Sequence, residues 1–356
     1  MKTILFTLCL IGLSAWMLPA QNPRNVLIYN LTSTDCGPCS CMDSILRVKV
    51  MAEFPQTIIL ALHGIGSVFG RYQGDSARNY FNASYEPSGF IDGLGYDVPH
   101  LAVNDTVASR YAHSPEAPVK IDIVSKTWDP VSRKVNLTLQ ATNIAADMQG
   151  PFWFNLVVTE SNLKHTHRTF TGCATPDVHG LPLRENYFNH WVVRKMEYWS
   201  RGDSLIGPAW AAQQSVTRTC SVAIDTAWIP ENCNIVVTIY KKADSLYKSN
   251  IQQAIRQSVT GGAGTVEKPP TTDAIMLIYP NPSKGLVNIH FSVSGESSCS
   301  LKIFDLAGKA VQTIVDYRVN PGLYNAEIET ESLPPGMYSC VLTTSSGQYR
   351  QSIIVR

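Results

Sequence analysis

The sequence lacks an excess of charge of either sign. Its 356 residues include 29 Lys and Arg against 28 Asp and Glu, which gives a formal net charge of +1 at pH 7. Binding to nucleic acid depends on a basic face that neutralises phosphates. The charge balance therefore argues against nucleic acid as a partner.

Several catalytic motifs are also missing. The sequence holds no Gly-rich phosphate loop, no Gly-x-Ser-x-Gly and no His-Glu-x-x-His. These patterns are typical of nucleotide-binding proteins, serine hydrolases and zinc proteases. We therefore expect no cofactor, and neither nucleotide nor hydrolase chemistry is supported.

The first 20 residues have the pattern of a secretory signal peptide. Lys2 precedes an uncharged apolar run at 4–18, and the small residue Ala20 marks the expected cleavage site. A transmembrane helix is the alternative, although the run is at the short end for spanning a bilayer. Cleavage removes Cys9 from the nine cysteines, and the eight that remain in a secreted chain permit disulfides.

Two of the remaining cysteines form a Cys-x-x-Cys motif with Gly-Pro between them, Cys36 and Cys39. An apolar run at 26–31 precedes the motif and a helix-like segment follows at 42–54, which is the strand and helix context of a redox dithiol. Both sulfurs would lie on the first helical turn, where amide groups and the helix dipole favour a thiolate. Cys36 is then the nucleophile and Cys39 the resolving thiol, while Gly37 lets a second segment approach closely.

Two structural alternatives remain open for Cys36 and Cys39, a zinc half-site and a small structural disulfide. No second Cys-x-x-Cys exists to complete a four-cysteine zinc site. The metal alternative is therefore the weaker of the two.

Residues 21–115 are predicted to form an α/β thioredoxin-like domain. The segments 26–31 and 57–62 both lack polar alternation, and a strand, a helix and a strand in succession predict parallel pairing of two buried strands. Pro87 is the candidate for a cis-proline beside the dithiol, with an ordinary trans proline in a turn as the alternative.

From residue 116 the pattern changes to short strands separated by turns, which predicts an immunoglobulin-like β-sandwich at 116–256. A polar and aromatic excursion at 165–210 is expected to be a long loop that carries binding. Within it, His165 and His167 alternate as ligands on one strand face would, but two ligands are too few and no metal is expected. The Gly-, Thr- and Pro-rich segment 257–272 is predicted to be a linker.

Residues 273–356 are predicted to form a second, small all-β sandwich. They carry Tyr-Pro-Asn-Pro at 279–282, an Asp-x-x-Gly-Lys turn at 305–309 and Pro-Gly-Met-Tyr at 335–338. With these motifs the segment closely resembles the C-terminal sorting domain of the type IX secretion system. The resemblance implies the type IX machinery as a partner and export to the outer-membrane surface or beyond, usually with removal of the domain.

The rest of the chain resembles the Omp-twenty-eight-related family of outer-membrane surface proteins, which join a thioredoxin-like domain to an immunoglobulin-like one. The matching residues are Thr32 with Cys36 and Cys39, Ala-Leu-His-Gly at 61–64, Pro-Ser-Gly at 87–89, and Tyr-Phe-Asn-His-Trp-Val-Val-Arg at 187–194. Where the family commonly has acidic residues in the first strand, this chain has Tyr29 and Asn30. That departure removes a proton acceptor for thiol exchange.

Three further cysteine pairs are predicted from strand spacing and elimination. They are Cys299 with Cys340, Cys220 with Cys233, and Cys41 with Cys173. On a helix each residue turns by about 100°, so Cys41 points away from both Cys36 and Cys39 and cannot replace Cys39 as resolving thiol. A buried, unpaired Cys41 is the alternative to its bond with Cys173.

Two functions from different classes fit these observations. The first, which we favour from the sequence, is a cell-surface binding or adhesion protein with an unknown protein or glycan ligand, in which the dithiol is mostly a structural disulfide on a thioredoxin-like scaffold. The second is a secreted thiol-disulfide oxidoreductase that uses Cys36 and Cys39. An assay of disulfide reduction with a Cys36→Ser control separates the two.

Overall fold

The computed structural model describes residues 22–64, 67–70, 81, 85–170, 183–245, 248–261, 273–279, 281–295, 297–319 and 322–356. The expected signal peptide at 1–20 and most of the expected linker at 257–272 lie outside these residues. No helix in this described part of the chain is long and apolar enough to cross a membrane.

The N-terminal part begins with a strand, a helix and a strand. The elements are β1 (Leu27–Thr32), α1 (Gly37–Ile45) extended by a π-helical turn (Leu46–Val50) into α2 (Met51–Glu53), and β2 (Ile58–His63). β1 and β2 pair in parallel from Leu27↔Ile58 to Thr32↔His63, as predicted. Every residue of both strands is buried, because both faces of the sheet are covered there.

A buried carboxylate, Asp92, joins the elements that follow. β3 (Ser88–Ile91) pairs antiparallel with β1, and a 3₁₀ turn (His100–Ala102) leads into α4 (Val103–His113). Asp92 accepts hydrogen bonds from the Leu27 amide at 2.8 Å, from Arg110 at 2.9 Å and from Arg24 at 3.4 Å. Burial raises the pKa of Asp92, and the Leu27 amide and the two guanidinium groups oppose that rise. The carboxylate therefore ties β1, β3, α4 and the chain before β1 together.

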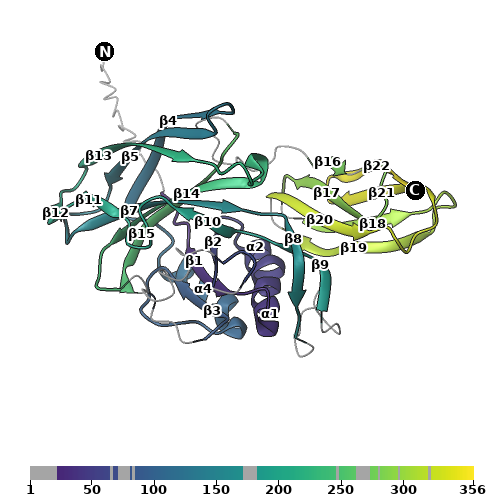
Figure 1. The fold of residues 1–356 in the computed structure, drawn as a ribbon, viewed down its shortest axis with the longest axis horizontal. Coiled ribbons are helices and arrows are strands. Elements are labelled where there is room, and N and C mark those ends of the chain that lie inside the picture. The colour runs from purple at the N-terminus through teal and green to yellow at the C-terminus, as the bar shows by residue number, and fades with distance from the viewer. Residues whose placement is uncertain are drawn as a thin grey trace, which may run out of the picture.

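The sheet that contains β1, β2 and β3 continues past the expected domain boundary at 115/116. Its strand order is β15-β14-β7-β10-β2-β1-β3, with β11 also paired to β7. β10 runs parallel to β2, where Val192 lies opposite Ala61 and the Ala61 amide donates to the Trp191 carbonyl at 2.9 Å. The added strands are β7 (Phe152–Glu160), β10 (Val192–Met196), β11 (Asp203–Ile206), β14 (Cys233–Lys241) and β15 (Asn250–Ser258). One mixed sheet thus spans both units (Figure 1), and the division into 21–115 and 116–256 stays a prediction.

A second sheet completes a β-sandwich over the later strands. It has the order β13-β5-β4, from β4 (Val119–Asp129), β5 (Lys134–Asn143) and β13 (Ser215–Ala223), and a short pair joins β6 (Met148–Gln149) to β12 (Ala209–Trp210). Apolar side chains of both sheets form one core, which includes Phe154, Leu139 and the fully buried Trp210. A β-sandwich in this part of the chain is therefore confirmed.

The polar and aromatic excursion at 165–210 is not a long loop in its described residues. It contributes to β8 (Leu163–Arg168), β9 (Leu183–Asn189), β10, β11 and β12, with β8 and β9 forming a hairpin. Trp210 is 0% exposed and His167 is 2% exposed, whereas Trp199 is 55% exposed. Most of the described residues of this segment are therefore part of sheets, and the loop expectation is wrong for them.

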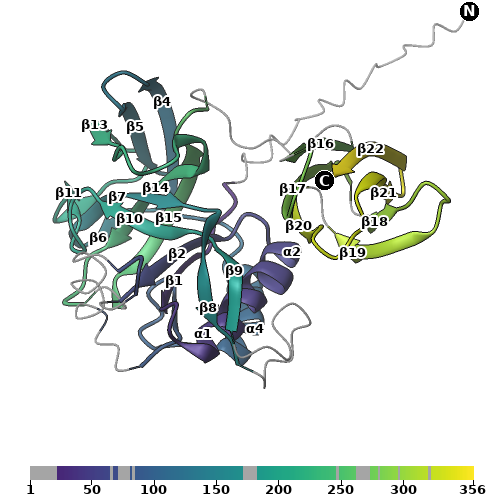
Figure 2. The same cartoon turned by 45° about the vertical axis from the view of Figure 1, so that its right-hand side comes forward.

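The C-terminal strands form a smaller sandwich of their own. One sheet has the order β16-β17-β20, from β16 (Ala274–Tyr279), β17 (Leu286–Val293) and β20 (Gly322–Glu329). The other has the order β19-β18-β21-β22, from β18 (Ser297–Phe304), β19 (Ala310–Val319), β21 (Gly336–Thr344) and β22 (Gly347–Val355). Figures 1 and 2 both show this sandwich as a separate body beside the other strands. Its core is drawn from both of its own sheets.

Two of the predicted disulfides do not form. Cys220, Cys233, Cys299 and Cys340 are all free and buried. Cys340 lies opposite Ile303, four residues along β18 from Cys299, so the two Cα atoms are separated by roughly 13 Å where a disulfide tolerates about 7 Å. Cys220 and Cys233 belong to the two facing sheets of the larger sandwich and pack as apolar groups in its core.

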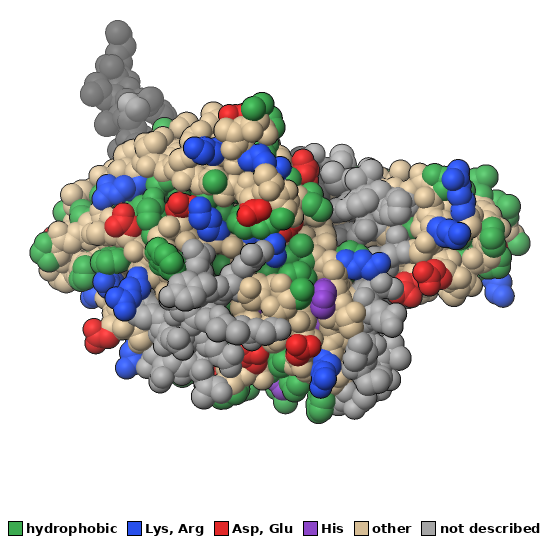
Figure 3. Space-filling model, viewed as in Figure 1, with side chains coloured by type: hydrophobic (Ala, Val, Ile, Leu, Met, Phe, Trp, Pro, Cys, Tyr) green, Lys and Arg blue, Asp and Glu red, His purple; other side chains and the backbone are tan. Residues whose placement is uncertain are grey.

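The charge balance of the sequence is also visible on the molecular surface. On the face drawn in Figure 3, Lys and Arg side chains are scattered among Asp and Glu side chains and do not gather into one basic patch. The expectation that nucleic acid is not a partner stays a prediction.

Candidate functional site

The Cys-x-x-Cys motif lies at the start of α1, where Cys36 and Cys39 are joined in a disulfide with a Cα–Cα distance of 5.3 Å. Cys36 is the residue that caps the helix, and its Sγ accepts a hydrogen bond from the Cys39 amide at 3.2 Å. Pro38 occupies the first turn, where a missing N–H needs no partner. Cys36 is half-buried and Cys39 is 0% exposed, so only the first cysteine of the pair is open to an incoming group.

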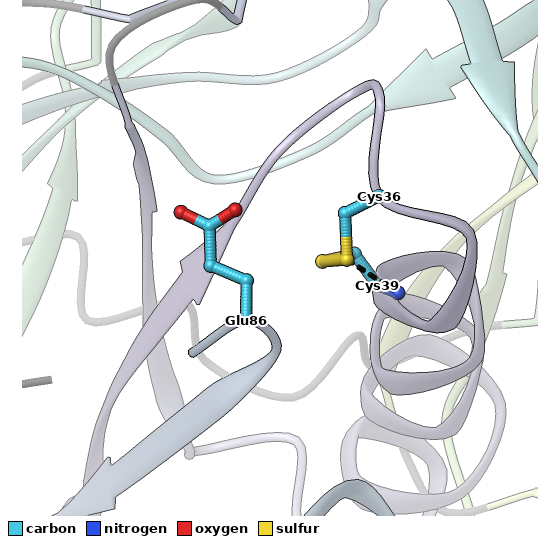
Figure 4. A group of neighbouring side chains, drawn as sticks. All are labelled: Cys36, Cys39 and Glu86. Atoms are coloured by element: carbon cyan, nitrogen blue, oxygen red, sulfur yellow. Dashed lines mark hydrogen bonds between the residues drawn. A yellow bond between two sulfur atoms is a disulfide. The ribbon is translucent and has the colours of Figure 1, made fainter. Parts of the chain in front are cut away.

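A carboxylate faces this disulfide from another element. The Glu86–Pro87 peptide bond is cis, as the candidate role of Pro87 predicted, and it lies directly before β3. β3 pairs with β1 so that Ser88 lies opposite Leu31, which brings the turn before β3 to the end of β1 where the dithiol loop begins. The Glu86 carboxylate and the two sulfurs lie within 4.8 Å of one another (Figure 4).

Sequence reasoning did not select Glu86 as a site residue. Its signal was its position directly before Pro87, the residue predicted to lie beside the dithiol. Glu86 is half-buried, and Pro87 behind it is buried. The side chain can therefore contact both solvent and the sulfurs.

The β8–β9 hairpin covers the other side of the motif. The Arg168 amide donates to the Thr34 carbonyl at 2.9 Å, which fixes the end of β8 beside the dithiol loop. A Cβ on Gly37 would meet the Thr169 carbonyl oxygen at 3.3 Å and the Phe170 Cβ at 3.7 Å. The prediction that Gly37 permits close approach of a second segment is confirmed, and that segment is the end of the hairpin.

A buried polar network connects the hairpin to α1. Asp43 forms an ion pair with Arg47 at 3.0 Å and accepts a hydrogen bond from the Tyr187 hydroxyl. Burial alone would raise the pKa of Asp43, but the charge of Arg47 and the Tyr187 hydrogen bond oppose that effect, and the pKa is lowered. Asp43 is therefore a structural anion that fastens β9 to α1.

The two weak metal candidates, His165 and His167, are placed differently from the sequence expectation. The ladder has an irregularity between His165 and His167, so the two do not follow the regular alternation expected of them. His165 Nδ1 lies 2.7 Å from the Thr166 carbonyl and His167 Nδ1 lies 2.6 Å from the Arg168 carbonyl. The zinc alternative for Cys36 and Cys39 also finds no support, because their sulfurs are bonded to each other.

Cys41 is disulfide-bonded, so the alternative of a buried, unpaired thiol is wrong. It is 2% exposed and packs against Tyr187. Its bonding partner lies outside the described residues, as does Cys173. The bond from Cys41 to Cys173 stays a prediction.

Comparisons with known proteins address the tail and the fold. Residues 277–356 match the family described as the secretion system C-terminal sorting domain. Residues 277–356 thus resemble a domain that directs a protein to a secretion system. Such a tail implies an interaction with the type IX secretion machinery, and hence a location at the outer-membrane surface or outside the cell. No curated protein matches the chain, and nothing found confirms the resemblance to the Omp-twenty-eight-related family.

Among solved structures, HBP35 of Porphyromonas gingivalis matches with 14% identity and a TM-score of 0.52, over 94% of this chain and 99% of that one. At this identity the match concerns the fold alone. Latent PorU of the same organism has 12% identity and a TM-score of 0.20 over 66% of this chain and 20% of that one. Red sea bream transglutaminase has 8% identity and a TM-score of 0.20 over 90% of this chain and 45% of that one. Neither of these two supports an argument.

Proposed function

We propose that the protein is an extracytoplasmic thiol-disulfide oxidoreductase with a thioredoxin-like N-terminal domain, carried to the cell surface by its sorting tail. The observation that carries the proposal is the unequal exposure of the two bonded cysteines. Cys36 is half-buried at the tip of α1, and Cys39 is fully buried behind it. A disulfide with one accessible sulfur is suited to exchange, because attack is directed to that sulfur.

The helix start supplies the electrostatics of the exchange. The Cys39 amide donates to Cys36 Sγ, and the first-turn amides and the helix dipole favour negative charge at that position. A substrate thiolate attacks Cys36 Sγ, the Cys36–Cys39 bond breaks, and the electron pair of that bond goes to Cys39. A second substrate thiolate then attacks the substrate sulfur of the mixed disulfide, which releases oxidised substrate and leaves Cys36 and Cys39 as thiolates that take up two protons to become thiols. The same steps in reverse reduce a substrate disulfide.

Three features of the backbone support the thioredoxin-like assignment. β1 and β2 are parallel with α1 between them, β3 is antiparallel to β1, and a cis-proline, Pro87, precedes β3 at the level of the dithiol. The parallel pair and the cis-proline were expected of a thioredoxin-like domain at 21–115, whereas the antiparallel pairing of β3 was not predicted. We prefer the redox function because Trp210 and His167, which were expected on the binding surface, are buried.

A binding or adhesion function remains the second candidate. It is favoured by the exposed aromatic side chains of Trp199 and Phe170, which are 55% and 47% exposed. Contiguous apolar patches open to solvent are typical of contact surfaces.

The experiment is catalysis of insulin reduction by dithiothreitol with the full mature chain. We expect turnover above the uncatalysed rate that is lost in Cys36→Ser and in Cys39→Ser. Cys299→Ser is the matched control, since Cys299 is a free, buried thiol of the tail sandwich. Equal rates for the wild-type chain and Cys36→Ser would leave the binding function as the better account.

A further inference from the structure

A buried resolving cysteine needs a route for its proton. Cys39 is 0% exposed, so neither its thiol nor its thiolate exchanges a proton directly with bulk water. A thiolate in apolar surroundings is unfavourable, and for this reason opening and closing of the disulfide requires a nearby group that gives and takes a proton.

The acidic groups near α1 differ in their ability to do this. Tyr29 and Asn30 are buried in β1, and neither offers a carboxylate at the positions where the resembled family commonly has acidic residues. Asp43 is held by Arg47 and Tyr187. Asp35 is exposed in the loop before Cys36 and is not part of the group that lies within 4.8 Å of the sulfurs.

We propose that Glu86 is the proton acceptor and donor of the Cys36–Cys39 pair. Its carboxylate lies within 4.8 Å of both sulfurs across the gap drawn in Figure 4, a distance bridged by one water or by a rotation of the side chain. Glu86 is half-buried, so it can exchange its proton with solvent between turnovers. The biological use of this group rests on the proposed redox function, but its chemistry can be tested without it.

The step can be written for closure of the disulfide. Cys36 carries a substrate sulfur in a mixed disulfide. Glu86 takes the proton of the Cys39 thiol, the Cys39 sulfur attacks Cys36 Sγ, and the substrate sulfur leaves as a thiolate with the electron pair. Two electrons pass from the dithiol to the substrate, and the proton passes from Glu86 to water. Opening of the disulfide runs the same step backwards.

Other charged groups face this region and define the controls. On the Glu86 side, Tyr85 donates a hydrogen bond to Asp97. On the opposite side, His167 and Arg168 lie on β8, and the charge of Asp35 acts on His167. Asp35→Asn removes the same charge as Glu86→Gln from the dithiol region without touching the proposed proton route.

The experiment is single-turnover oxidation of the reduced, full mature chain by oxidised glutathione between pH 5 and 9. Samples are quenched with alkylating reagent, and decay of the Cys36–glutathione mixed disulfide is followed by mass spectrometry. In the wild-type chain we expect decay that reaches a plateau by neutral pH. In Glu86→Gln we expect decay about 100-fold slower at pH 7, rising with pH until Cys39 ionises by itself. Glu86→Asp should retain most of the rate, and Asp35→Asn should keep the plateau.

The direction of the rate change in Glu86→Gln distinguishes proton transfer by Glu86 from a purely electrostatic effect of its charge. Loss of a negative charge beside Cys39 would by itself lower the pKa of that thiol and speed closure. A Glu86→Gln rate that is unchanged or faster at pH 7 therefore overturns the proposal. Failure of the insulin assay with an intact glutathione profile would reject the proposed function alone. A midpoint of thermal unfolding equal to that of the wild-type chain shows that each variant retains the fold.

Discussion

Three histidines close enough to Asp43 to feel its charge are kept neutral by their surroundings. Burial lowers the pKa of His63 to about 3 and of His190 to about 4, with further lowering by the charge of His167 on His63 and of Arg47 on His190. Burial also lowers the pKa of His167. Each side chain is thus an uncharged packing element at neutral pH, and His63 is further held by Ser67 at 2.9 Å.

Neutral buried histidines predict that the fold weakens in mild acid. In the unfolded chain a histidine takes up a proton below about pH 6.5, whereas folded His63 and His190 stay neutral to about pH 3 and about pH 4. The unfolded state binds more protons in that window, so the free energy of unfolding falls by about 1.4 kcal/mol per pH unit for each histidine as pH drops from 6.5 to 4. Urea unfolding at several pH values measures the slope. His63→Gln should reduce the slope by one proton, and an unchanged slope would contradict this.

The four free cysteines predict a simple result in thiol titration. Burial raises the pKa of Cys340 to about 12 and of Cys299 to about 11, and it also raises those of Cys220 and Cys233. A buried neutral thiol reacts slowly, so these four should react with a thiol reagent only after denaturation. Mapping without reduction checks the result. Peptides linked through Cys299 and Cys340 would show that the register between β18 and β21 is different.

At the scale of elements, the local sequence pattern predicted the strand, helix and strand that carry the dithiol. Two apolar runs on either side of a helical segment predicted parallel β1 and β2, and the Cys-x-x-Cys spacing predicted that the dithiol lies at the start of a helix. Glu86 could not be chosen in the same way, because its place depends on the pairing of β3 with β1 over a distance of some sixty residues. The contact between Gly37 and the end of the β8–β9 hairpin could not be predicted either, because Thr169 is far from Gly37 in sequence.

The bond made by Cys41 is the element-scale prediction that remains open. Of the nine cysteines, two form the dithiol bond and four are free, which leaves Cys9 and Cys173 as partners for Cys41. Cys9 lies in the expected signal peptide. We expect peptide mapping of the mature chain to link Cys41 with Cys173, which would fasten α1 to the segment between β8 and β9. A Cys39–Cys41 link would refute the start of α1 at Gly37.

Asp92 gives a test of how the N-terminal elements are held together. Removing a buried carboxylate leaves Arg24 and Arg110 without their charged partner, so we expect Asp92→Ala to destabilise the fold by about 3 to 5 kcal/mol. The matched control is Asp122→Ala, whose ion pair with Lys120 is exposed and is expected to matter by less than about 1 kcal/mol. Chemical denaturation measures both variants. Similar losses would show that the Asp92 cluster is dispensable.

At the scale of the whole molecule, composition predicted where the units divide but not how their strands connect. The change to turn-separated strands at 116 and the Gly-rich segment at 257–272 marked where the pattern alters. That the first three strands share a sheet with β10 was not readable, because β10 is short and pairs with β2 through a single opposed position, Val192 with Ala61. The tail was recognisable from its motifs, of which 305–309 lies between β18 and β19 and 335–338 lies at the start of β21.

Deletion of the tail tests the independence of the two bodies. The sandwich of β16 to β22 has its own core and lies apart from the remaining strands (Figure 2). We therefore expect a chain lacking residues 273–356 to fold, to unfold at the same denaturant concentration as the remainder of the full chain, and to stay in the periplasm. Cell fractionation and surface proteolysis give the location. Efficient surface display of the truncated chain would contradict the role of the tail.

The parallel contact between β2 and β10 also sets an order of events during synthesis and export. A chain that emerges amino end first can complete β1, β2 and β3 early, but the outer edge of β2 has no strand to pair with until residues near 192 arrive. For that interval the outer edge of β2, which is mostly apolar, is open to other chains. The sheet can therefore be completed only after strands from the middle of the sequence have emerged.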